Sequence, residues 1–137
     1  MKTLVLMLCL LMGIQASAQE LTQITAPVIV AKIPLGETVI FEEAAITFES
    51  VMEDSRCPKD VTCVWEGEAR IRVIIESGSD RMVKQLIFHG ERFGSEEENM
   101  LVETKTKKLI GYKLSPYPES TVPQNKRKYF LEVNLKH

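Results

Sequence analysis

The sequence predicts an all-β protein, an antiparallel β-sandwich of the immunoglobulin-like type with seven or eight short strands. Short runs rich in Val, Ile, Phe and Tyr alternate with turn residues at the spacing typical of this class. The run 68–76 has a period of two: Ala69, Ile71 and Val73 face one side and arginines the other. Only residues 94–109 have helix-forming composition, and their β-branched residues favour a single turn at most. A small β-barrel would give the same pattern and remains an alternative.

The N-terminal half contains five of the expected strands. Pro27 and Pro34 confine the first strand to a sheet edge or to a short length, because proline has no N–H to donate to a neighbouring strand. The turn residues 77–80 join the last two strands of this half as a hairpin. The expected strands cover residues 26–36, 37–41, 45–52, 68–76 and 82–89.

The C-terminal half contains three further strands and a proline-rich loop, residues 115–125. Alternation places Ile110, Tyr112 and Leu114 on one face of the strand 107–115. In the last strand, the side chains expected to face inward are Tyr129, Leu131, Val133 and Leu135. The expected strands cover residues 98–103, 107–115 and 128–136.

The N-terminus has the pattern of a signal peptide. A single lysine precedes an apolar run, residues 4–14, and the small residues 16–18 follow it. We expect cleavage after Ala18, which gives a signal peptide at 1–18 and a single β-sandwich domain at 19–137. An uncleaved membrane anchor is the alternative. Cys9 lies inside the apolar run and is not a lipid-attachment site. The signal peptide predicts that the protein is exported, to the periplasm or to the outside.

The charge balance excludes some partners. Seventeen Lys and Arg against nineteen Asp and Glu give a net charge of −2, and loss of Lys2 makes the chain one unit more negative. This balance provides no attraction for nucleic acid or for an anionic membrane. No later segment is apolar for long enough to form a transmembrane helix.

Two cysteines remain after signal cleavage, Cys57 and Cys63. An even number in an oxidising compartment predicts a disulfide between them. So short a loop gains only about 2 kcal/mol from chain entropy, so its role is to fix a local shape.

The residues around this disulfide favour a structural role for residues 53–73. Asp54 is typical of a turn, and the planar guanidinium of Arg56 can clamp a carboxylate or several carbonyls. Residues 62–65 are expected to re-enter a strand, with Trp65 packed beside the disulfide over one end of the core. Gly67 indicates a bulge or a close backbone approach.

The motif D-S-R-C-P-x(2)-V-x-C-x-W-x-G, residues 54–67, resembles that of an uncharacterised family of small exported bacterial β-rich proteins. The run L-S-P-Y-P-E-S, residues 114–120, followed by a hydrophobic last strand, is similar to the same family. The resemblance covers most of the mature chain. It implies an exported β-rich domain and no activity, cofactor or catalytic residue. Some members look like lipoproteins, whereas this chain has no usable lipid-attachment cysteine.

No catalytic residue is expected, and we do not expect an enzyme. The two histidines, His89 and His137, have no nucleophile motif beside them, since neither G-x-S-x-G nor S-x-x-K occurs. A small hydrolase built around His89 and nearby acidic residues is an alternative.

No metal or other cofactor is expected, because a Cys-x5-Cys spacing with no His pair is not a zinc site. Two metals remain alternatives. Calcium would use acidic residues near the disulfide, with Asp54 and Glu66 the first to test. Copper would use His89 with Met82 or Met100.

The sequence therefore favours a non-enzymatic binding or structural module of the bacterial cell envelope, with a protein or a glycan as partner. The candidate binding loop comprises Asp54, Arg56, Lys59 and Tyr117. A narrower alternative is a protease-inhibitor-like loop that presents Arg56 or Lys59.

Overall fold

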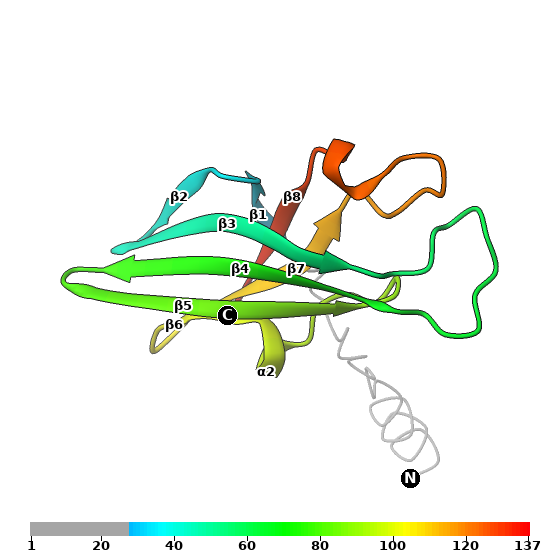
Figure 1. Ribbon diagram of the computed structural model, residues 1–137. Helices are drawn as coiled ribbons and strands as arrows, with labels where there is room; N and C mark the ends of the chain where they lie inside the picture. Colours follow the sequence, from blue (N-terminus) through cyan, green and yellow to red (C-terminus); the bar gives the residue numbers. More distant parts are fainter. Residues whose placement is uncertain (1–27) are drawn as a thin grey trace, which may run out of the picture.

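The computed structural model describes residues 28–137, which fold into two four-stranded antiparallel sheets (Figure 1). The expected signal peptide and its cleavage site lie outside the described residues. The first sheet has the order β1 (Val28–Pro34), β8 (Phe130–Lys136), β7 (Lys108–Ser115) and β6 (Met100–Glu103). The second sheet has the order β2 (Thr38–Phe41), β3 (Ala44–Asp54), β4 (Glu68–Ser77) and β5 (Asp80–His89). All eight expected strands are present, and the antiparallel sandwich is confirmed over the small barrel.

The connections are simple. Within each sheet, neighbouring strands also follow one another in the chain, except that β1 pairs with β8. The chain crosses between sheets after β1 and again after β5. The likeness to immunoglobulin domains therefore lies in the two-layer architecture, because those domains use Greek-key connections.

The core lies between the two sheets. In β4, Ala69, Ile71 and Val73 are fully buried and Arg70 is exposed, which confirms the period of two. Other strands of both sheets supply the remaining completely buried large hydrophobic side chains: Ile33, Ile46, Phe48, Leu86, Phe88, Leu109, Leu114, Leu131 and Val133.

One expectation for β7 is wrong, namely a shared face of Ile110, Tyr112 and Leu114. The register against β8 shifts between Gly111 and Lys113, so one extra residue is inserted there. Leu109 and Leu114 consequently both join the core, although they lie on opposite faces of an unbroken strand.

The helix-forming segment yields one turn, α2 (Glu96–Asn99), as expected; a 3-10 turn, η1 (Gln124–Lys126), precedes β8. The Asn99 side chain is completely buried. Its amide donates to the Ile87 carbonyl at 2.8 Å and accepts from the Ile87 N–H at 2.9 Å. Asn99 thus takes the place of a neighbouring strand along part of the β5 edge. No helix in residues 28–137 is long and apolar enough to cross a membrane.

Candidate functional site

Residues 55–67, here called the disulfide loop, leave β3 and return to β4 as a protrusion at one end of the molecule (Figure 1). The expected disulfide between Cys57 and Cys63 is present, with 5.9 Å between the Cα atoms. The expected strand at 62–65 is wrong, because β4 begins at Glu68.

The base of the disulfide loop is held by the backbone. The Ser55 N–H donates to the Glu68 carbonyl at 2.8 Å, and the Cys57 N–H donates to the Glu66 carbonyl at 2.8 Å. Between these bonds lies Gly67, with a φ of +68°. A Cβ at Gly67 would lie 1.9 Å from the Ser55 carbonyl oxygen, so the expected close approach is confirmed.

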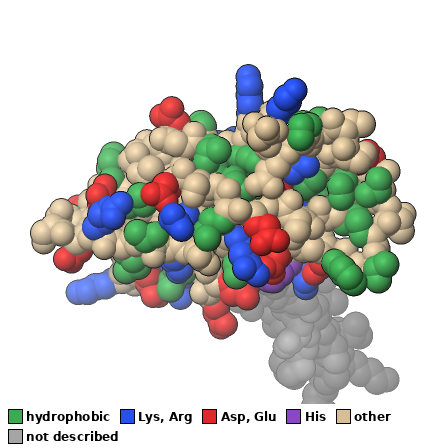
Figure 2. Space-filling model, in the orientation of Figure 1, with side chains coloured by type: hydrophobic (Ala, Val, Ile, Leu, Met, Phe, Trp, Pro, Cys, Tyr) green, Lys and Arg blue, Asp and Glu red, His purple; other side chains and the backbone are tan. Residues whose placement is uncertain are grey.

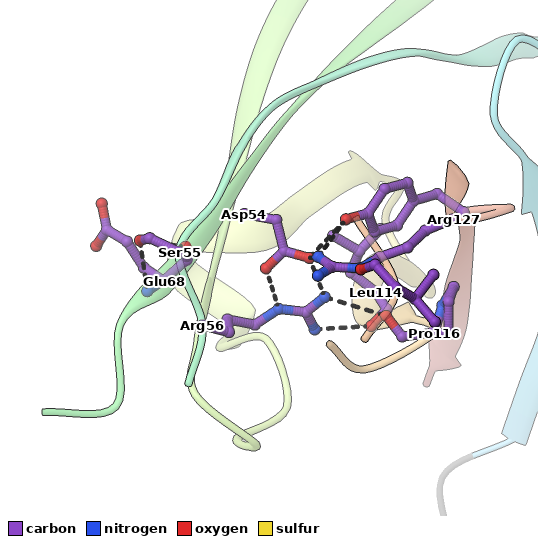
Figure 3. A network of polar contacts seen from close by, with 9 residues as sticks. Asp54, Ser55, Arg56, Glu68, Leu114, Pro116 and Arg127 are labelled. Carbon is purple, nitrogen blue, oxygen red and sulfur yellow. Dashed lines mark hydrogen bonds and ion pairs between the residues drawn. The ribbon is translucent and has the colours of Figure 1, made fainter. Parts of the chain in front are cut away.

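Beneath the loop, Asp54 and Arg56 form a buried ion pair (Figure 3). Arg56 Nε donates to Asp54 Oδ1 at 2.8 Å, and Nη2 donates to Oδ2 at 2.9 Å. The Asp54 side chain is 0% exposed and that of Arg56 is 2% exposed. Such a two-bond fork is the strongest geometry available to an arginine and a carboxylate.

Arg56 also holds the chain after β7. Its Nη1 donates to the Leu114 carbonyl at 2.9 Å and its Nη2 to the Pro116 carbonyl at 3.2 Å. The guanidinium carbon lies 4.9 Å from the centroid of the Tyr117 ring. The expected clamp is confirmed, and it holds a carboxylate and two carbonyls at once.

Two residues near the start of β8 complete the pairing of Asp54. The Tyr129 hydroxyl donates to Asp54 Oδ2 at 2.7 Å, and Arg127 Nη1 donates to the same oxygen at 3.2 Å. Arg127 Nε donates to the Val122 carbonyl at 3.1 Å. Asp54, Arg56, Arg127 and Tyr129 are called the Asp54 network below.

The Asp54 network shifts the pKa values of two of its groups, the Asp54 carboxyl and the Tyr129 hydroxyl. Burial raises the pKa of Asp54, but hydrogen bonds from Arg56 and Tyr129 and the charges of both arginines lower it by more, so the pKa lies below its ordinary value. The pKa of Tyr129 is raised, first by burial and then by its hydrogen bond to the Asp54 carboxylate. Asp54 is therefore a structural anion at neutral pH.

These contacts correct three expectations. Asp54 and Arg56 are buried, so they do not form part of an exposed binding loop, and an inhibitor-like loop cannot present Arg56. Calcium coordination by Asp54 is also wrong, because two guanidinium groups and a hydroxyl occupy its oxygens. The sequence could not reveal this, because the partners that enclose Asp54 include residues far along the chain.

The disulfide loop also contacts the segment 116–120, along a seam of hydrogen bonds and an ion pair. The Lys59 N–H donates to the Pro118 carbonyl at 3.0 Å, and the Lys59 side chain forms an ion pair with Glu119. The Ser120 N–H donates to Asp60 Oδ1 at 2.9 Å. Hydrogen bonds from the side chain and backbone of Ser120 lower the pKa of Asp60. The two stretches that carry the family resemblance therefore lie side by side, although about sixty residues separate them.

The apex of the disulfide loop is apolar and exposed. Trp65 is 78% exposed and Val64 is 94% exposed, with Val61 exposed nearby. Figure 2 shows hydrophobic side chains gathered at the end of the molecule where Figure 1 places this loop. The expected packing of Trp65 over the core is wrong: the loop lies outside both sheets, and the Asp54 network lies beneath it. The sequence contains one signal of this exposure. Two adjacent apolar residues, Val64 and Trp65, stand between Cys63 and Glu66 without the period-two pattern of a strand.

Of the expected binding residues, Lys59 and Tyr117 are the two that reach the surface. Lys59 is exposed, with its ammonium paired to Glu119. Tyr117 is half-buried, and burial is the main cause of its raised pKa. Both residues line a hollow between the disulfide loop and residues 91–92.

His89, the candidate residue for copper binding or hydrolysis, lies beside Glu68. Its Nδ1 lies 3.6 Å from Glu68 Oε2, and Glu68 also pairs with Arg70. Met82 lies seven residues earlier on β5, roughly 24 Å away along the strand, so His89 and Met82 cannot share a copper ion. Within residues 28–137, no three His, Cys, Asp or Glu side chains are grouped closely enough to hold a metal ion.

The chain matches no protein-family model, no curated protein and no solved structure in the comparisons made. The family resemblance of the motif at 54–67 therefore stays a prediction. The fold and the site define a class of protein: a two-sheet β-sandwich that presents a disulfide-closed loop on a buried ion-pair network.

Proposed function

We propose that this protein is an exported, non-enzymatic binding module of the bacterial cell envelope, and that its partner is a protein bound through the apex of the disulfide loop. The apex consists of Val61, Val64 and Trp65. The observation that carries the proposal is the 78% exposure of Trp65. Tryptophan is among the residues most enriched at the energetic centres of protein interfaces.

The other distinctive residues of the motif have structural contacts that account for them. Asp54 and Arg56 form the buried pair, the cysteines close the loop, and Gly67 permits the close approach to Ser55. Within residues 28–137, Trp65 has no comparable internal role, because its side chain is largely exposed. A partner that buried this side chain would remove about 150–250 Å² of its surface from water.

The anchoring of the loop supports binding without large rearrangement. The disulfide, the Asp54 network and the seam with 116–120 fix the loop at separate points. A loop that is ordered before binding loses less conformational entropy when a partner docks. Charged side chains around the apex, those of Lys59, Asp60 and Glu66, would form the polar rim that surrounds an apolar centre in protein interfaces.

Export is supported by the disulfide, because such bonds persist in oxidising compartments. The signal-peptide pattern at 1–18 agrees with this. The periplasm and the extracellular space both meet this condition.

Photo-crosslinking in the native cells tests the proposal. A benzophenone amino acid placed at Val64 is expected to form one reproducible adduct with a partner protein. The same group at Ile40, which is 72% exposed on β2, is the matched control and is expected to form none.

Binding to the purified partner is then measured by calorimetry. We expect Trp65→Ala to weaken affinity by about 2 kcal/mol or more, and Ile40→Ala to leave it unchanged. Equal affinity of the wild type and Trp65→Ala would disprove a role for the apex.

A further inference from the structure

A shallow groove lies beside the disulfide loop; of the apex residues, Val61 lines it, whereas Val64 and Trp65 do not. Two adjoining hollows of about 440 and 300 Å³ form it, and they share Lys59, Glu91 and Tyr117 as lining residues. Phe93 and Lys113 line the smaller hollow, and Pro58 lines the larger one. These volumes lie within the range of roughly 300–1,000 Å³ that is typical of small-ligand sites.

Two aromatic side chains of the groove, Tyr117 and Phe93, each pack against another side chain. Tyr117 packs on the guanidinium of Arg56, with 4.9 Å from the guanidinium carbon to the ring centroid. Phe93 stacks on Tyr112, with 4.2 Å between centroids and 9° between ring planes, yet it is 55% exposed. The groove therefore offers aromatic surface that is already ordered before a ligand arrives.

The charges of the groove divide into paired and unpaired groups. Lys59 pairs with Glu119, and Arg92 pairs with Glu66. Among residues 28–137, neither Glu91 nor Lys113 has an ion-pair partner. The Lys113 ammonium instead lies 5.9 Å from the Phe93 ring centroid. The aromatic surface is thus accompanied by one acceptor-only carboxylate and one donor-only ammonium.

We propose that this groove binds an oligosaccharide. A pyranose ring has a face of C–H bonds, which can stack on Phe93 or Tyr117, and a rim of hydroxyl groups. Those hydroxyls can donate to the Glu91 carboxylate and accept from the Lys113 ammonium. The proposal goes beyond the binding role of the loop apex, because the stacking and hydrogen-bonding residues are different.

Other ligand classes fit these residues less well. An apolar ligand would desolvate Glu91 and Lys113 without pairing them, which is costly. An anionic ligand would pair with Lys113 but would be repelled by Glu91, so the two unpaired charges oppose each other. Peptides that add to a sheet need a free strand edge, and the Tyr112 carbonyl of β7 already accepts from the Gly94 N–H at 2.7 Å.

An NMR titration of the exported protein tests the proposal. The probes are the tetramers of β-1,4-linked N-acetylglucosamine, of β-1,4-linked glucose and of α-1,4-linked galacturonic acid. At least one of the two neutral probes is expected to shift amide signals of residues 57–61, 90–94 and 113–118 in a saturable way, with the acidic probe weaker. Absence of saturable shifts for all three at about 10 mM, where even weak sites are detected, would overturn the proposal.

Two variants separate stacking from charge. Phe93→Leu and Glu91→Gln are each expected to weaken binding at least about tenfold, and Tyr117→Phe is expected to preserve it. Glu43→Gln, an exposed acid at the β2–β3 turn, is the matched control and should bind as the wild type does. Unchanged affinity in both Phe93→Leu and Glu91→Gln would overturn the proposal.

The Trp65→Ala variant keeps this test distinct from that of the loop apex. It is expected to bind the saccharide normally while losing affinity for the protein partner. Loss of saccharide binding in Trp65→Ala would overturn the assignment of the sugar to the groove.

Discussion

Arg56 and Asp54 face each other across two parallel hydrogen bonds of 2.8 and 2.9 Å, although only Ser55 separates them in the chain. The pair sits where β3 ends and the disulfide loop begins. Because Arg56 also holds the carbonyls of Leu114 and Pro116, it joins the loop to the opposite sheet. The position of the disulfide loop therefore depends on two charged groups, Arg56 and Asp54, whose side chains are buried.

Truncation of this arginine should be among the most damaging single changes in the domain. We expect Arg56→Ala to lower the free energy of unfolding by about 3–5 kcal/mol, because it leaves the buried Asp54 carboxylate short of its main partner. Denaturant titration followed by circular dichroism measures this. The matched control is Arg72→Ala, whose ion pair with Glu49 is exposed and should contribute about 1 kcal/mol or less. Equal losses in both variants would contradict the prediction.

Stability should depend on pH through Asp54. The pKa of Asp54 in the folded protein is below its ordinary value of 3.8, so the charged form is favoured by folding. Its contribution is fully present above the unfolded pKa and is lost as pH falls through the folded pKa. We expect Asp54→Asn to flatten the fall in unfolding free energy between about pH 5 and pH 2. Parallel curves for wild type and variant, measured by urea titration, would show that other carboxylates dominate.

Gly67 should be irreplaceable for a reason beyond its dihedral angle. Gly67 and Gly78 have similar positive φ values, +68° and +60°. A Cβ at Gly78 meets nothing within 4 Å, whereas one at Gly67 would collide with the Ser55 carbonyl. We expect Gly78→Ala to cost about 1–2 kcal/mol from the backbone alone and Gly67→Ala clearly more. Similar melting temperatures for the two variants would refute the close approach.

The disulfide should contribute modestly to global stability. We expect the double variant Cys57→Ser with Cys63→Ser to lose about 2 kcal/mol, with a lower melting temperature and an unchanged β-sheet circular dichroism spectrum. The sheets are independent of the bond, since both cysteines lie outside every strand. An unchanged melting temperature would mean that the Asp54 network alone fixes the loop.

Truncation of Tyr117 should destabilise the fold more than truncation of Trp65. A tryptophan buried over the core would give the opposite order. Trp65 is exposed, so Trp65→Ala should change the unfolding free energy by no more than about 0.5 kcal/mol. Tyr117 packs on the buried Arg56, so Tyr117→Ala should cost about 1–2 kcal/mol. Chemical denaturation of the two variants compares them directly. A larger loss for Trp65→Ala would place its ring in the core.

Alternation along the chain predicts the eight strands, because each strand buries one face, but the expected strand at 62–65 is absent. It failed in β7, where the register shift near Gly111 leaves no mark in the pattern of residue types. The turn at α2 was predicted from composition, but the pairing of Asn99 with Ile87 depends on a contact between separate elements.

The candidate site was predictable only in its local parts. The disulfide, the clamp by Arg56 and the constraint at Gly67 follow from residue types within one short stretch. Arg127 and Tyr129 lie 73 and 75 residues from Asp54, and nothing local indicates that they converge on it. Trp65 was misplaced because large aromatic side chains are buried in most folds, and a loop outside both sheets breaks that rule.

The pairing of β1 with β8 sets a condition on the order of assembly. Val28 lies opposite Leu135, so the first sheet joins the two ends of the described chain. Because synthesis proceeds from the N-terminus, β1 lacks its neighbour until nearly all other residues have followed. Contacts between such distant residues slow folding. A chain interrupted before residue 130 would leave both β1 and β7 with open edges, and open edges invite pairing with other chains.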